Sequence, residues 1–256
     1  MGIIQATLVA GAASALAWRG GALRRSGALA AAAVGTVTLA AGGWLAGAVL
    51  IAFFLPSSAM SRLWPPPVSP LDPKGDRRDG WQVLANGGAP ALALAIGGPG
   101  ALLAFAAGLC AAAADTWATA VGAHSRGNPR HILTGRVVPP GTSGGITPLG
   151  TAGAALGAGL VASSALLLVG WPGALVALGI GIGGMLLDSI LGACIQGRFR
   201  CEHCRMESEQ QVHQCGHRTV LQGGRVWMNN DGVNALTTIS ATAAGWAVWL
   251  LWVRWP

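Results

Sequence analysis

Residues 101–123 read ALLAFAAGLCAAAADTWATAVGA. A run of about 20 apolar residues is long enough to cross the hydrocarbon core of a membrane as a helix, and this run carries a single charged side chain, Asp115. An ionised carboxylate in hydrocarbon costs several kcal/mol unless it lines a cavity or holds a cation. The stretch therefore predicts a transmembrane helix that contributes a functional aspartate.

The rest of the chain has the composition of an integral membrane protein. Of its 256 residues, 52% are hydrophobic and 10% are charged, whereas about a quarter of the residues in a soluble domain are charged. The 40 glycines suit helices that pack closely through small residues, as helices do in lipid. We expect a single integral membrane domain over residues 1–256, with the lipid bilayer as its first partner.

Apolar runs and the breaks between them predict an all-α fold, a polytopic membrane helical bundle of about seven transmembrane helices. The expected spans lie near residues 3–18, 27–55, 82–96, 101–123, 146–169, 173–196 and 229–253. Gly97–Gly100 and Gly170–Pro172 have the Gly/Pro content of tight turns. Three long polar loops, residues 57–80, 124–145 and 197–228, then fall on one face.

The distribution of basic residues predicts the orientation. The three long loops carry 12 of the 16 Lys and Arg residues, and such an excess marks the cytoplasmic face. We therefore expect a protein of the cell inner membrane with these loops in the cytoplasm, its amino terminus inside and its carboxyl terminus outside. Arg19, Arg24 and Arg25 would then lie on the outer face. Because the net charge of +7 is explained by these loops and by anionic ligands, nucleic acid is not an expected partner.

Three aspartates are predicted to lie at one depth near the cytoplasmic boundary. Asp115 and Asp188 each precede the inner end of a span by about two turns, and Asp231 opens the last span. Asn86, early in its span, reaches the same depth. A solitary aspartate is equally well explained as a helix-packing group or a neutral acid, but three of them at one depth beside basic loops favour a shared site.

The neighbours of the aspartates suit a magnesium site. Thr119 lies four residues after Asp115 and therefore on the same helical face, and Ser189 follows Asp188 directly. The further oxygen donors beside Asp231 are Asn230 and Asn234. Hard oxygen ligands of this kind hold Mg²⁺ together with phosphate and water, so Asp115, Asp188 and Asp231 are the predicted metal ligands. Plain N-capping is the alternative for Asn230 and Asp231.

A glycine-rich loop is the candidate phosphate cradle. Its central residues are Gly141, Thr142, Ser143, Gly144 and Gly145, and it leads directly into a predicted helix. Glycines there let backbone N–H groups approach an anion, and a helix start adds positive potential. Arg130 and Arg136 would neutralise phosphate oxygens. The alternative is that these basic residues only orient the protein in the membrane. The loop is not a Walker A sequence, since it has no Gly-Lys-Ser/Thr.

The third loop carries a cysteine and histidine pattern. Cys201 and Cys204 are followed by Cys215, with His213 and His217 on either side of it. This spacing fits a tetrahedral structural zinc site made of the three cysteines and one of the two histidines. Free thiols in a solvated loop and redox chemistry are the alternatives, and a reducing cytoplasm disfavours a disulfide.

Five sequence blocks together resemble the integral membrane family that includes plant and cyanobacterial phytyl-phosphate kinase, long catalogued as a domain of unknown function. The blocks are ADTWATAVG at 114–122, NPR at 128–130, TGRVVPPGTSGGIT at 134–147, DSILGA at 188–193 and NNDGVN at 229–234. Residues 79–88 also resemble the family, so that the likeness covers most of the chain.

The resemblance implies a membrane-embedded kinase. Such an enzyme transfers the terminal phosphoryl group of a nucleoside triphosphate, with CTP the expected donor, to an isoprenyl monophosphate. The aspartates with Mg²⁺, the two arginines and the glycine loop would be its site. A cytidylyltransferase that makes a CDP-lipid would use similar metals and substrates. A transporter of a lipid phosphate or other anion is a further alternative, although transporters usually bind substrate at the midplane.

Overall fold

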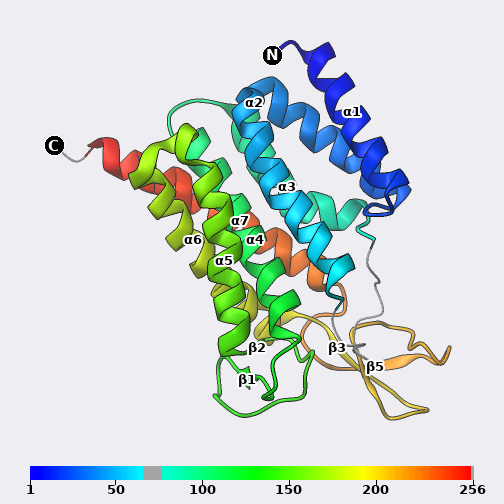
Figure 1. The fold of residues 1–256 in the computed structure, drawn as a ribbon. Coiled ribbons are helices and arrows are strands. Elements are labelled where there is room, and N and C mark those ends of the chain that lie inside the picture. The colour runs from blue at the N-terminus through cyan, green and yellow to red at the C-terminus, as the bar shows by residue number, and fades with distance from the viewer. Residues whose placement is uncertain (66–76, 255–256) are drawn as a thin grey trace.

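The computed structural model describes residues 1–65 and 77–254, and it is mostly helical (Figure 1). Its helices are α1 (Ile3–Arg19), α2 (Arg25–Leu63), α3 (Gly80–Ile96), α4 (Ala101–Gly122), α5 (Pro148–Ser164), α6 (Leu166–Ile195) and α7 (Asn230–Arg254). Within the described residues, α2, α4 and α6 are long and apolar enough to cross a membrane, and α1 is a shorter apolar helix. Residues 66–76 of the first predicted loop lie outside the described residues.

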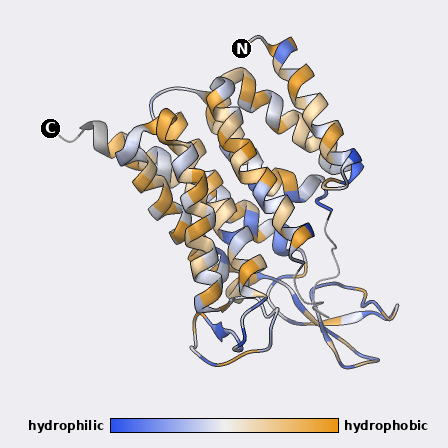
Figure 2. Ribbon diagram, viewed as in Figure 1, coloured by the Kyte–Doolittle hydropathy of each residue, from blue (hydrophilic) through white to orange (hydrophobic). Residues whose placement is uncertain are grey.

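Helix α4 is the centre of the bundle. Its residues from Leu103 to Ala114 are all buried, and most of them are alanines, whose small side chains allow neighbouring helices to come close. A Cβ atom added to Gly245 of α7 would lie 2.9 Å from the Cα atom of Ala104. The helices are predominantly apolar, whereas hydrophilic residues gather in the loops at one end of the bundle (Figure 2).

Helix α2 is two helical halves separated by Gly43. The backbone of Gly43 has φ 69° and ψ −166°, a conformation open to glycine and strained for any residue with a side chain. Figure 1 shows α2 turning back on itself between its two ends. Consequently the two ends of α2 approach each other: a Cβ atom on Gly21, before α2, would lie 3.1 Å from Nη2 of Arg62, near its end.

This reversal corrects the predicted placement of the first basic residues. The backbone N–H of Arg24 donates to the Arg78 carbonyl at 2.9 Å, and the N–H of Arg78 donates to the Ala22 carbonyl at 3.1 Å. The α1–α2 connection, with Arg19, Arg24 and Arg25, therefore lies beside the end of the first long loop and not on the opposite face. The prediction treated residues 27–55 as one continuous helix, whereas α2 consists of two halves that meet at Gly43.

The predicted positions of the termini are also wrong. The start of α1 and the end of α7 both lie at the end of the bundle away from the strand-bearing loops (Figure 1). The sequence predicted termini on opposite faces because it counted seven single crossings. With α2 bent into two halves, the number of passes through the bundle becomes even.

The boundary between the fifth and sixth helices also differs from the prediction. Helix α5 ends at Ser164 and α6 begins at Leu166, so only Ala165 separates them. The predicted turn at Gly170–Pro172 is instead a break within α6, where Gly170 has φ 69° and ψ 172°. Two helical segments meet at Gly170, so the predicted break at these residues is confirmed. The further break at Ala165 was not predicted.

Short strands modify the expectation of an all-helical chain. Strands β1 (Arg130–His131) and β2 (Gly145–Ile146) pair in antiparallel fashion within the second loop. The third loop folds into an antiparallel sheet of order β4-β3-β5, made of β3 (Arg198–Cys201), β4 (Glu207–Ser208) and β5 (Thr219–Gly223). These strands order two of the loops that carry predicted site residues.

Candidate active site

Asp115 of α4 and Asp188 of α6 form a carboxyl pair. Their side chains are half-buried and lie within hydrogen-bonding reach of each other. The hydroxyl of Thr237, on α7, donates a hydrogen bond of 3.0 Å to Oδ1 of Asp188. Three helices that are separate in sequence therefore meet at this pair, as predicted for the two aspartates.

Glycines on α6 bring the two carboxyl groups together. A Cβ atom on Gly181 would lie 2.7 Å from Cβ of Cys110, and one on Gly184 would lie 2.6 Å from Cβ of Ala111. Either distance is too short for two carbon atoms, so α4 and α6 approach closely only because both positions lack a side chain. Asp115 follows Ala111 by four residues and Asp188 follows Gly184 by four, which places both carboxyl groups one turn beyond this contact.

Helix α7 carries a further buried oxygen one turn before Thr237. Asn234 lies three residues before Thr237 and therefore on the same side of α7. Its Oδ1 atom is buried and accepts no hydrogen bond from the described residues. A buried, unsatisfied oxygen is costly unless a ligand completes its hydrogen bonding or coordination.

The start of α7 distinguishes capping from ligand-binding residues. The N–H of Gly232 donates to Oδ1 of Asn229 at 3.0 Å, so Asn229 is the residue that caps the helix. Capping was the alternative role for Asn230 and Asp231, and Asn229 already fills it. Both of these side chains are half-buried in the first turn of α7, where the helix dipole favours an anion.

Asn86 joins the same region through α3. It is buried, with 9% of its surface exposed. The carbonyl of the preceding residue, Ala85, accepts a hydrogen bond from the Thr238 hydroxyl. Thr238 is adjacent to Thr237, so α7 bonds to α6 and α3 at successive residues.

The donor set of this region fits magnesium. Asp115, Asp188 and Asn234 offer hard oxygen atoms, which Mg²⁺ prefers. Within the described residues, the carboxylate of Asp231 does not form a cluster of three acids with the other two aspartates, so the predicted convergence is seen for Asp115 and Asp188 alone. Two carboxylates at hydrogen-bonding distance repel each other when both are ionised, so a proton or a cation must accompany them. The unsatisfied oxygen of Asn234 is a further ligand that a cation would use.

The glycine loop is docked on α6 next to the carboxyl pair. Gly144 has φ +81°, and a Cβ atom there would lie 2.6 Å from Cβ of Ala193 and 2.9 Å from the Ser189 carbonyl oxygen. Ser189 follows Asp188 directly. Glycine at position 144 is thus required both by backbone conformation and by space, and the loop lies within about one turn of the carboxyl pair, as α6 geometry dictates.

Several hydrogen-bond donors in and after the glycine loop, which the sequence offered for binding phosphate, already donate to other groups of the protein. The N–H of Gly145 donates to the Thr142 carbonyl at 2.9 Å, and Gly150 N–H donates to the Thr147 hydroxyl, which caps α5. The Thr142 hydroxyl donates to the Pro139 carbonyl at 2.8 Å. These bonds give the loop its shape and leave fewer groups for an anion than the sequence suggested.

Glu209 is a site neighbour that the sequence did not reveal. Its Oε1 atom accepts hydrogen bonds of 2.9 Å from the Ser143 hydroxyl and of 2.9 Å from Nε2 of Gln196. It thereby joins the glycine loop to the end of α6. Glu209 belongs to no motif, and only the folding of the third loop brings it to this position.

The two predicted arginines lie in the loop and not against the carboxyl pair. Both side chains are exposed, and Nη1 of Arg130 donates to the Gly135 carbonyl at 3.0 Å. The N–H of Arg136 donates to the hydroxyl of Thr134 at 3.4 Å. Thr119 is likewise exposed on α4. These residues lie at the loop end of the bundle. They would contact a phosphate group of a bound ligand only where the ligand extends from the aspartates toward the loops.

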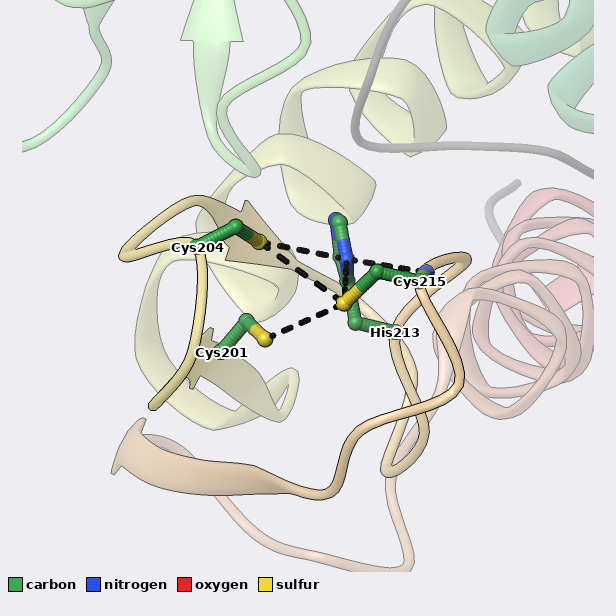
Figure 3. A group of neighbouring side chains, drawn as sticks. All are labelled: Cys201, Cys204, His213 and Cys215. Atoms are coloured by element: carbon green, nitrogen blue, oxygen red, sulfur yellow. Dashed lines mark hydrogen bonds between the residues drawn. The ribbon is translucent and has the colours of Figure 1, made fainter.

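Three cysteines and a histidine form a second cluster in the third loop (Figure 3). The ligand atoms of Cys201, Cys204, His213 and Cys215 all lie within 4.8 Å of one another. Hydrogen bonds, first among them one from the Cys204 backbone N–H, lower the pKa of the Cys201 thiol and favour its thiolate. Of the two candidate zinc ligands among the histidines, His213 belongs to the cluster and His217 does not. The ring of His217 instead stacks on that of His203, with 4.1 Å between centroids.

Comparisons with known proteins agree with the membrane fold. The family model of integral membrane protein DUF92 matches residues 8–242. An uncharacterized membrane protein of Methanocaldococcus jannaschii is 40% identical over 131 residues, which are 48% of this chain and 55% of that protein. Protein PGR of Arabidopsis thaliana is 29% identical over 249 residues, covering 84% of each chain.

The chain thus spans about half the length of the archaeal relative and most of the plant protein. No solved structure matches it. The family match covers most of the chain and includes all the sequence blocks on which the resemblance was based. The chain therefore belongs to the integral membrane protein family DUF92, as those blocks predicted.

Proposed function

We propose that this protein is a membrane-embedded kinase that transfers the terminal phosphoryl group of a nucleoside triphosphate, CTP, to an isoprenyl monophosphate. The observation that carries the proposal is the meeting of Asp115, Asp188 and Thr237 from three helices, with the glycine loop docked on the next turn of α6. Membership of the DUF92 family, with its resemblance to phytyl-phosphate kinase, supports the same reaction.

In the proposed reaction, an oxygen of the acceptor monophosphate attacks the γ-phosphorus of CTP. The bond between that phosphorus and the β–γ bridging oxygen breaks, and CDP leaves with the electron pair. The products are CDP and the isoprenyl diphosphate. A phosphate monoester is largely dianionic at about pH 7, so the acceptor needs no general base, and catalysis consists of positioning and charge compensation.

Each group of site residues has its own proposed role in this reaction. Asp115, Asp188 and Asp231, with Asn234, would hold Mg²⁺, which supplies positive charge against the repulsion between the two phosphate groups. Thr237 fixes the Asp188 carboxyl group by its hydrogen bond. The glycine loop lies beside Asp188 and would meet the donor phosphates, while Arg130 and Arg136 would bind phosphate oxygens that extend toward the loop.

The bend in α2 supports a particular membrane arrangement. We propose that the helices cross the cell inner membrane, with the two halves of α2 as separate passes, so that the chain makes an even number of crossings. The strand-bearing loops and the candidate active site would lie at the cytoplasmic side. The lipid tail of the acceptor would remain between helices in the bilayer, and the nucleotide would arrive from water.

Product analysis of the purified protein tests the proposal. The protein is incubated with Mg²⁺, radiolabelled CTP and prenyl monophosphates of graded chain length, and the products are separated. We expect CDP and a prenyl diphosphate, with one range of chain lengths preferred. Pyrophosphate and a CDP-lipid would instead identify a cytidylyltransferase, and a failure to consume any nucleoside triphosphate would overturn the enzymatic proposal in favour of transport.

A further inference from the structure

We propose that Cys201, Cys204, His213 and Cys215 bind one structural Zn²⁺ ion, and that this ion holds the third loop in the fold that presents Glu209 to the glycine loop. The cluster lies at the end of β3 and in the connections that join β3 to β4 and β4 to β5, and it contributes no residue to the aspartate site (Figure 3). The proposal does not depend on the kinase reaction.

Four of the six ligand–ligand distances in the cluster are close to those of a tetrahedral zinc site, and the other two are at most 4.8 Å. With Zn–S bonds near 2.3 Å, two sulfur ligands of a tetrahedron lie about 3.8 Å apart, and a sulfur and a nitrogen ligand lie about 3.5 Å apart. The Sγ atom of Cys215 lies 3.6 Å from that of Cys201 and 3.9 Å from that of Cys204. Nδ1 of His213 lies 3.4 Å from Sγ of Cys204 and 3.1 Å from Sγ of Cys215.

Two tight turns carry the ligand atoms. In the first, the N–H of Arg205 donates to the Cys201 carbonyl at 3.0 Å, and Arg205 has φ 62°, a rare conformation for a residue with a side chain. In the second, the N–H of Gly216 donates to the His213 carbonyl at 2.8 Å, and Gly216 has φ 82°. Each turn therefore directs two ligands toward a common centre.

The environment of the side chains suits a structural metal. Cys201 has 0% of its surface exposed and His213 has 9%, although the surrounding loop is largely exposed. Nδ1 of His213 faces the sulfur atoms of Cys204 and Cys215. It also accepts the backbone N–H of Cys215 at 3.3 Å, a hydrogen bond that a bound metal would replace. Within the described residues, this group is also the one whose His, Cys and carboxylate atoms converge as metal ligands do.

The metal would order the residue that joins this loop to the rest of the molecule. Glu209 lies between the two ligand-bearing turns, and its carboxylate accepts hydrogen bonds from Ser143 and Gln196. The loop has few large buried side chains of its own, the largest being Phe199 with 6% exposed. Small units with so little core usually require a metal or disulfides to fold.

Metal analysis of the full-length protein tests the site. The protein is purified in detergent without added chelator, and its zinc content is measured by mass spectrometry. We expect about one zinc ion per chain. Cys201→Ser and Cys215→Ser should lose most of the metal, whereas Cys194→Ser and His217→Ala, which lie outside the four ligands, should retain it.

Cobalt substitution keeps the test independent of whether these variants fold. Zinc in the wild-type protein is exchanged for Co²⁺, and the absorption spectrum is recorded. Tetrahedral Co²⁺ with three thiolates should give intense d–d bands and a sulfur charge-transfer band. Limited proteolysis should also cut within residues 198–223 faster after chelation. A wild-type protein without bound zinc, or an octahedral cobalt spectrum, would overturn the proposal whatever the outcome of the CTP assay.

Discussion

Asp115 and Asp188 come from helices that are distant in sequence, yet their carboxyl groups lie within hydrogen-bonding reach. Replacing either one by Asn keeps the size of the side chain and removes its negative charge. If the pair holds the metal, we expect Asp115→Asn and Asp188→Asn each to lower kcat by at least about 100-fold, the magnitude typical of a lost charge-stabilising group. Initial rates of CDP formation measure this effect.

Glu207→Gln is the matched control for these variants. Glu207 is exposed in β4, and the same change from acid to amide there should leave both kcat and the detergent-solubilised fold unchanged. Near-normal turnover in either aspartate variant would remove that aspartate from the proposed metal site.

Thr237 acts on the site through Asp188 and is therefore a positioning residue. Thr237→Val keeps the shape of the side chain and deletes the 3.0 Å hydrogen bond to the carboxylate. Loss of such an orienting partner typically costs about 10- to 100-fold in metal affinity or activity. We expect the apparent Mg²⁺ affinity in the kinase assay to fall by about 10-fold or more, and Thr237→Ser to restore most of it. An unchanged Mg²⁺ dependence would contradict the positioning role.

The sequence identified the aspartates because a charge in an apolar segment is conspicuous. Thr237 gave no comparable signal, since hydroxyl residues are compatible with any helix surface, and α7 contains several of them. Glu209 was missed because it lies in a polar loop, where a carboxylate is expected for solubility alone. Its partners, Ser143 and Gln196, become apparent only from the tertiary fold.

At the scale of the helices, the contact between α4 and α6 sets the separation of the two carboxyl groups. A Cβ atom at Gly184 would lie 2.6 Å from Cβ of Ala111, so Gly184→Ala must push the helices apart. Overpacking of this kind costs about 1–3 kcal/mol. We expect a lower Tm in a thermal-shift assay and a loss of activity larger than that caused by Gly183→Ala.

Gly183 is the control because it is exposed on the same helix and a Cβ atom there would meet nothing within 4 Å. If Gly184→Ala and Gly183→Ala behaved alike in stability and activity, the close α4–α6 contact would not determine the geometry of the site.

Most helix boundaries were predictable from apolar runs and from their breaks, and α4 was predicted almost to the residue. The reversal within α2 was not predicted. The pair Gly42–Gly43 is a possible turn signal, but the same pair occurs at Gly87–Gly88 and Gly183–Gly184, where the helix continues. The short strands escaped prediction for a different reason. Their pairing depends on partners in the same folded loop, and polar loop sequences carry little of the alternation that marks strands.

At the scale of the whole molecule, the bend in α2 determines where the ends of the chain emerge. The first residue of α1 and the last of α7 lie at the end of the bundle opposite the strands. We expect epitope tags added to either terminus to be digested by protease outside intact spheroplasts, and a tag inserted after Gln222, in β5, to be protected. Lysed spheroplasts provide the control, since all three tags should then be cut. Tags on the two termini with opposite protection would contradict the proposal of an even number of membrane crossings.

Helix α4 has a consequence for how the protein is made. It is the most enclosed of the apolar helices, and it bears an aspartate. A segment with so little surface for lipid gains little from entering the bilayer alone, and its carboxyl group opposes entry. During synthesis, α4 should therefore stay with the insertion machinery until α5 and α6 emerge from the ribosome. Release of these helices as a group would bury Asp115 beside Asp188 at the moment of integration.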